Sequence, residues 1–99
     1  MAEWIYLLHP PRDDFAASMS DEERAAFAEH RAYLEGHLAQ GSLILAGPTG
    51  GTVNTGVVVL EAPDEASAQA IMDADPVIVA GIMRGELRGF RTTLLRGRA

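Results

Sequence analysis

Two residues of this chain, His30 and Asp75, have the chemistry to move a proton, and both lie where apolar residues are expected. His30 lies on the apolar stripe of the first predicted helix, between Phe27 and Leu34. Asp75 ends the apolar stripe of the second predicted helix, directly before Pro76. An imidazole titrates near neutral pH, and a carboxylate bonded to one ring nitrogen fixes its tautomer and stabilises its protonated form. If both stripes face one cleft, the pair can act as a general base on a hydroxyl or an activated carbon.

A purely structural interpretation of the same two residues stays open at this point. His30 can be a core histidine whose ring nitrogens are satisfied by neighbours, and Asp75 can simply cap the short segment that begins at Pro76. The two interpretations differ in whether the imidazole and the carboxylate meet beside a pocket.

Around the pair, the sequence offers further candidate binding residues at the ends of strands and in turns. Tyr6 shares a strand face with Trp4 by alternation, which favours packing first and pocket lining second. His37 is expected at the solvent edge of the first helix. Three histidines without an HxH or HxxxH spacing and without cysteine do not favour a metal site, and no cofactor is expected. We assign substrate binding to His9, Tyr6, Gly47, Pro48 and Gly56.

The elements that must position these residues follow from periodicity and from turn residues. Ser20 and Glu23 form a capping-box pattern that starts the first helix, and Gly41 ends it. Asp64 caps the second helix, which Pro76 ends. Residues 10–18 read as a polar loop and 77–83 as a short apolar segment. Strands are predicted over residues 3–9, 42–46, 54–62 and 86–95.

The order strand, helix, strand, strand, helix, strand predicts an α+β fold of the ferredoxin-like βαββαβ type. In this fold two helices cover one face of a four-stranded antiparallel sheet. The other face stays bare, and Val57 and Val59 would point from it into water. An apolar patch of this kind favours a homodimer that packs sheet against sheet.

Composition narrows the class of protein further. The 99 residues suit a single domain over residues 1–99, and the formal net charge of −6 argues against a nucleic-acid partner. There is no cysteine, no run long enough to span a membrane and no signal-peptide pattern, so we expect a cytoplasmic protein without a membrane partner.

Laid out in this way, the chain resembles the YciI-like (YCII-related) family. The resemblance rests on an ordered series of motifs rather than on any one of them. The series is His30 with Tyr33-Leu34, then Gly41, then Ala46-Gly47-Pro48, then Gly56, and finally Asp73-Ala74-Asp75-Pro76 with Val79-Ala80-Gly81.

The resemblance implies the dimeric α/β-barrel superfamily and a His–Asp catalytic pair, which carries over to His30 and Asp75. It also implies chemistry such as elimination of hydrogen chloride from a chlorinated hydroquinone. The glycine-rich loop after Pro48 and the long loop 10–18 depart from the family pattern, so substrate identity is not transferred. Our hypothesis is a cofactor-independent enzyme that catalyses an elimination or isomerisation on a small, aromatic or enol-containing substrate. The alternatives are a dimeric ligand-binding or interaction module without chemistry, and a monooxygenase-like member of the superfamily.

Overall fold

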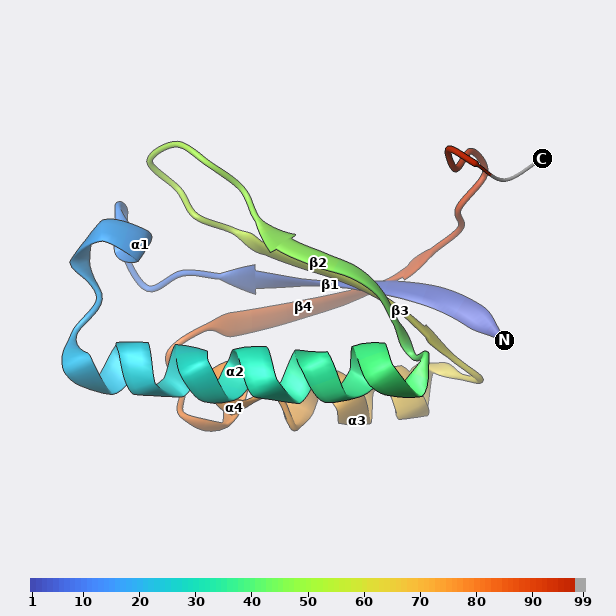
Figure 1. The fold of residues 1–99 in the computed structure, drawn as a ribbon, viewed down its shortest axis with the longest axis horizontal. Helices are drawn as coiled ribbons and strands as arrows, with labels where there is room; N and C mark the ends of the chain where they lie inside the picture. Colours follow the sequence, from blue (N-terminus) through green and yellow to red (C-terminus); the bar gives the residue numbers. More distant parts are fainter. Residues whose placement is uncertain (98–99) are drawn as a thin grey trace.

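The four strands of the chain form one antiparallel sheet in the order β2-β3-β1-β4 (Figure 1). The computed structural model describes residues 1–97. The strands are β1 (Ala2–His9), β2 (Leu43–Pro48), β3 (Gly56–Ala62) and β4 (Arg84–Phe90). With β1 and β3 in the centre and β2 and β4 at the edges, this is the predicted ferredoxin-like α+β arrangement, which is confirmed.

The helices α2 (Asp21–Gln40), α3 (Glu65–Asp73) and α4 (Pro76–Val79) cover one face of the sheet, and α1 (Phe15–Ser18) lies at one end (Figure 1). Helix α2 begins as predicted. The Ser20 side chain accepts a hydrogen bond from the Glu23 amide, and the Glu23 carboxylate accepts one from the Ser20 amide. Gly41 ends the helix at φ +88°, a conformation that costs glycine little.

Strand register decides which side chains face the helices. Tyr6 lies opposite Val58, and Trp4 lies opposite Leu60, so Trp4 and Tyr6 share the helix-covered face as predicted. Gly56 lies opposite Leu8, and a Cβ on Gly56 would come within 3.1 Å of the Leu8 Cβ. The close approach expected at Gly56 is therefore present, because a larger residue here would require Leu8 to shift.

The opposite face of the sheet, called the open face below, carries Ile5, Leu7 and Val57 in partly exposed positions. Val59 shares this face but is already buried in the single chain, where the sequence predicted it in water. The helix-facing core and this smaller group therefore lie on opposite sides of one sheet.

Two predicted segments differ from the structure. The loop 10–18 contains α1, whose Phe15 is buried with only 1% of its surface exposed. The second strand continues through Gly47 and Pro48, which were expected to end it. An edge strand tolerates a proline because one side of it makes no ladder hydrogen bonds.

The remaining differences concern the ends of elements. The third strand begins at Gly56 rather than at residue 54, and the last ends at Phe90 rather than at residue 95. The apolar segment 77–83 begins with α4. Leu38, expected on the inward stripe of α2, is 57% exposed and lines an open cavity beside the helix.

Candidate functional site

His30 lies on the sheet-facing side of α2 and is bonded to Asp75. Its Nδ1 lies 2.7 Å from Asp75 Oδ1 and 2.9 Å from Oδ2, and 14% of its side chain is exposed. Because an ionised carboxylate can only accept, Nδ1 carries the hydrogen of this bond. The other ring nitrogen, Nε2, is then the one that a bound molecule can meet.

Asp75 is fully buried and does two tasks. The sequence predicted that Asp75 ends α3. Asp75 lies outside that helix instead, because Pro76 forces it into an extended conformation (φ −62°, ψ 127°). It becomes instead the residue before α4, and its Oδ1 accepts a hydrogen bond from the Val77 amide at 3.2 Å. The capping interpretation and the pairing interpretation thus hold together for one carboxylate.

Tyr6 reaches the same carboxylate from the sheet. Its hydroxyl donates a 2.8 Å hydrogen bond to Asp75 Oδ2, and the side chain has no exposed surface. Burial raises the pKa of Tyr6 well above its usual range, and the charge and hydrogen bond of Asp75 raise it further. Tyr6 therefore stays a neutral donor at physiological pH. It lies beneath the site and does not line the cavity, in contrast to the substrate contact assigned to it from the sequence.

A cavity of about 760 Å³ opens between α2 and the β2 side of the sheet, with His30 in its wall. Its lining is mostly apolar, which is typical of sites for small organic molecules. The rings of Phe15 and Phe27 lie 5.5 Å apart, and those of Phe27 and His30 lie 5.3 Å apart. These three rings form a continuous aromatic row that leads to His30.

Three of the residues predicted to bind substrate lie at this cavity: Gly47, Pro48 and Gly56. They come from the adjoining ends of β2 and β3, where Pro48 pairs with Gly56.

His9 does not reach the cavity. It lies on the open face, where its Nε2 is 2.9 Å from Glu86 Oε1 and Arg88 bonds the other oxygen of that carboxylate. The hydrogen bond from His9, followed by that from Arg88, lowers the pKa of Glu86. The prediction that His9 faces the site is wrong for this chain, because odd-numbered residues of β1 point away from the helices.

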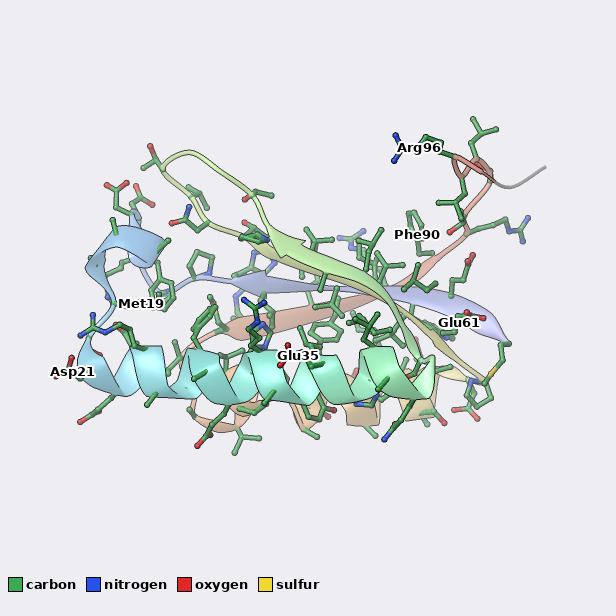
Figure 2. The ribbon with its side chains drawn as sticks, viewed as in Figure 1. Met19, Asp21, Glu35, Glu61, Phe90 and Arg96 are labelled. Carbon is green, nitrogen blue, oxygen red and sulfur yellow. The ribbon has the colours of Figure 1, made fainter. Side chains whose placement is uncertain are left out.

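Phe15 is held in the cavity wall by a clasp at the start of α2. Arg12 makes two hydrogen bonds to the Glu23 carboxylate, at 2.9 and 2.7 Å, and its guanidinium lies 5.1 Å from the centre of the Phe15 ring. The hydrogen bonds from Arg12 lower the pKa of Glu23 to about 2. Figure 2 shows Met19, another cavity residue, between this segment and α2.

The third histidine has a local role. His37 Nδ1 lies 2.7 Å from the Ser42 hydroxyl, and the ring packs against Tyr33 at 4.7 Å near the end of α2. Within residues 1–97, no three His, Asp or Glu side chains come together as a metal site would need.

Fold and site together define a ferredoxin-like α+β protein with a His–Asp pair at the wall of an apolar cavity. The chain belongs to the YCII-related domain family, whose pattern matches residues 4–88.

A solved structure with this fold is that of the 5-chloro-2-hydroxyhydroquinone dehydrochlorinase TftG from Burkholderia phenoliruptrix AC1100, in complex with 2,5-dihydroxybenzoquinone. The two chains share 21% sequence identity with a TM-score of 0.68, over 92% of this chain and 94% of TftG. No curated protein matches the sequence. In the described part of the chain, no helix is long and apolar enough to cross a membrane.

Sequence reasoning missed two contributors to this region. The Tyr6–Asp75 hydrogen bond joins residues 69 positions apart, from β1 and from the residue that precedes α4. Phe15 was missed because it lies in a loop of polar residues. A lone aromatic residue in such a loop could have predicted a buried side chain.

Proposed function

We propose that this protein is a cofactor-independent enzyme in which His30 acts as general base, oriented by Asp75. The observation that carries the proposal is the 2.7 Å bond between His30 Nδ1 and a fully buried carboxylate at the wall of a cavity. This geometry presents Nε2 with its lone pair to a ligand and stabilises the positive charge that forms on the ring.

The reaction class follows from the proposed role of His30 as general base. Nε2 accepts a proton from an acidic hydroxyl or carbon, and the electron pair left behind moves into the substrate. In an elimination this pair expels a leaving group such as chloride, which departs with its bonding electrons. In an isomerisation the proton returns to another atom.

An aromatic substrate is favoured by the cavity itself. The row of Phe15, Phe27 and His30 offers ring faces and edges to a planar molecule, and the surrounding wall is apolar. The dehydrochlorinase TftG, which has the same fold, binds the planar ring of 2,5-dihydroxybenzoquinone. This likeness supports a hydroxylated, chlorinated ring as the first substrate to try.

We further propose that the functional unit is a homodimer joined through the open face. Partly exposed Ile5, Leu7 and Val57, together with the half-exposed Leu45, give this face an apolar centre that a second copy would cover. The cytoplasmic location expected from the sequence stays a prediction.

The proposal is tested by chloride release from 5-chloro-2-hydroxyhydroquinone and by calorimetric binding of 2,5-dihydroxybenzoquinone. Wild type is compared with His30→Ala, Asp75→Asn and the control His37→Gln, whose ring lies outside the cavity. Loss of the base is expected to lower turnover about 10²- to 10⁴-fold, while the control retains activity. Full activity in both site variants would refute the proposal.

A non-catalytic binding module remains the second candidate, favoured by the size of the cavity and by the apolar open face. It predicts tight binding of a planar ligand with no turnover of any ring tried. In that case His30→Ala changes only the dissociation constant.

A further inference from the structure

We propose that Tyr6 is a positioning residue that tunes the basicity of His30 through Asp75, from a place that no substrate reaches. This inference rests on the proposed function, in which His30 is the base. It replaces the substrate contact assigned to Tyr6 from the sequence with an action through another residue.

The geometry gives Tyr6 this role and no other in the site. Its hydroxyl lies 2.8 Å from Asp75 Oδ2, and its side chain has no exposed surface. It takes no part in the cavity wall, so a ligand beside His30 does not touch it. The ring is fixed in the central strand β1, which pairs with β3 on one side and with β4 on the other.

Asp75 distributes its two oxygens among three donors. Oδ1 accepts from His30 Nδ1 at 2.7 Å and from the Val77 amide at 3.2 Å, while Oδ2 accepts from Tyr6 and lies 2.9 Å from the same Nδ1. The amide fixes one end of the carboxylate and Tyr6 fixes the other. The carboxylate plane is thereby held toward the imidazole.

The donors also set how much negative charge His30 experiences. A phenol hydroxyl in contact with a carboxylate withdraws part of its charge without neutralising it. Burial and the neighbouring carboxylate raise the pKa of Tyr6, so the hydroxyl keeps its proton across the working pH range. Removing the hydroxyl leaves more negative charge on the Asp75 carboxylate, and this charge favours the protonated imidazole of His30.

Among the described residues, the other charged side chains in the cavity lining all come from α2. Arg24, Arg31 and Glu35 come from α2 itself, and Arg31 pairs with Glu35 at 3.7 Å in an exposed position. Tyr33, also on α2, donates to the Ile71 carbonyl at 2.6 Å rather than to Asp75. Tyr6 is therefore the neighbour from the sheet that acts on the carboxylate.

The test is the NMR titration of the His30 ring in four proteins: wild type, Tyr6→Phe, Tyr33→Phe and Asp75→Asn. Phenylalanine preserves the ring of Tyr6 and leaves Asp75 bonded to His30 and Val77, so Tyr6→Phe is expected to fold. Its His30 titration midpoint is expected to rise by about 0.5 to 1 pH unit. Asp75→Asn should shift it in the opposite direction, because the stabilising charge is gone.

Tyr33→Phe is the matched control, because it removes a partly buried hydroxyl that senses the charge of Asp75 but donates its hydrogen bond to the Ile71 carbonyl. Its midpoint should stay at the wild-type value. An unchanged or lowered midpoint in Tyr6→Phe, with Asp75→Asn shifted down, would overturn the inference. An equal rise in both tyrosine variants would overturn it as well, since the effect would then be general.

The titration needs no substrate, so its outcome is separate from that of the proposed function. If Tyr6→Phe shifts His30 but His30→Ala retains full turnover, the tuning exists and the enzyme hypothesis fails. If His30 is required for turnover and Tyr6→Phe leaves its titration unchanged, the base is right and the role of Tyr6 is wrong.

Discussion

Two imidazole–carboxylate pairs of nearly equal length lie on opposite faces of the same sheet. His30 Nδ1 lies 2.7 Å from Asp75 on the helix-covered face, and His9 Nε2 lies 2.9 Å from Glu86 on the open face. The side chains of the first pair are 14% and 0% exposed, and those of the second are 27% and 30% exposed. Residue types and distances alone therefore do not decide which pair does chemistry.

The two carboxylates differ in the other side chain that each one binds besides its histidine. Asp75 receives the neutral hydroxyl of Tyr6, whereas Glu86 receives the cationic guanidinium of Arg88. A neutral donor leaves the carboxylate with a net charge to share with the imidazole, while a cation already balances it. The buried pair also lies in a lower dielectric, where the same charge acts more strongly. The pair to which we assign proton transfer is therefore the more buried one, and the described hydrogen bonds of its carboxylate include none from an arginine.

The largest effect that tests this comparison is the loss of stability when each carboxylate is removed. Asp75→Ala leaves Tyr6 and His30 without their buried partner and removes the cap of α4, so it should cost about 3 kcal/mol in the free energy of unfolding. Glu86→Ala affects a solvated pair and should cost far less. Urea unfolding followed by the fluorescence of Trp4, the single tryptophan, measures both.

Asp75→Asn is the companion variant, since its single amide oxygen can still accept a hydrogen bond from either Tyr6 or the Val77 amide. It should recover part of the stability lost in Asp75→Ala. Equal losses in the Asp75 and Glu86 variants would show that burial does not distinguish the two pairs.

How far the fold could be predicted depends on which residues carry local signals. The capping box of Ser20 and Glu23, and Gly41 at the helix end, are local, so α2 was predicted almost to the residue. Helix α1 is stabilised instead by distant groups: the Asp14 amide bonds the Thr52 carbonyl, and the Ala16 amide bonds the Asn54 side chain. Such contacts leave no pattern in the residues 10–18 themselves.

The residues of the site also differ in how far the sequence could predict their positions. Helical spacing and the proline after Asp75 were enough to single out His30 and Asp75. That Tyr6 lies under Asp75 depends on strand order and on the path from α3 into α4, neither of which a single segment specifies. The position of His9 could have been predicted, because alternation along β1 places His9 on the sheet face opposite to the face that carries Tyr6.

A third ion pair, between Arg12 and Glu23, differs from both histidine pairs because it lies on the cavity side of the sheet and its arginine is exposed. Hydrogen bonds from Arg12 hold the pKa of Glu23 at about 2, below the unfolded value of roughly 4.3. A lowered carboxyl pKa contributes stability that is complete above the unfolded value and is lost as the pH falls through the folded value. Wild type should therefore lose more stability than Glu23→Gln between about pH 5 and pH 2.

The measurement is the urea midpoint of both proteins at several pH values in that window. The loss should be smaller than that of Asp75→Ala, because Arg12 is 41% exposed in its side chain. Parallel pH profiles for wild type and Glu23→Gln would contradict a stabilising role for the clasp.

The smallest expected effect is the response of the two histidines to salt. At about 1 M salt, screening acts over roughly 3 Å, so the exposed pair of His9 and Glu86 should weaken while the buried pair should not. NMR titrations at low and high salt should move the midpoint of His9 by less than about 0.5 pH unit and leave that of His30 in place. Equal responses would mean that water reaches both pairs alike.

Figure 2 shows that Phe90 and Arg96, like the His9–Glu86 pair, lie on the side of the sheet away from α2. If two copies cover the open face, the salt response of His9 should fade as protein concentration rises, since assembly would exclude water from this pair and leave the His30 pair unchanged.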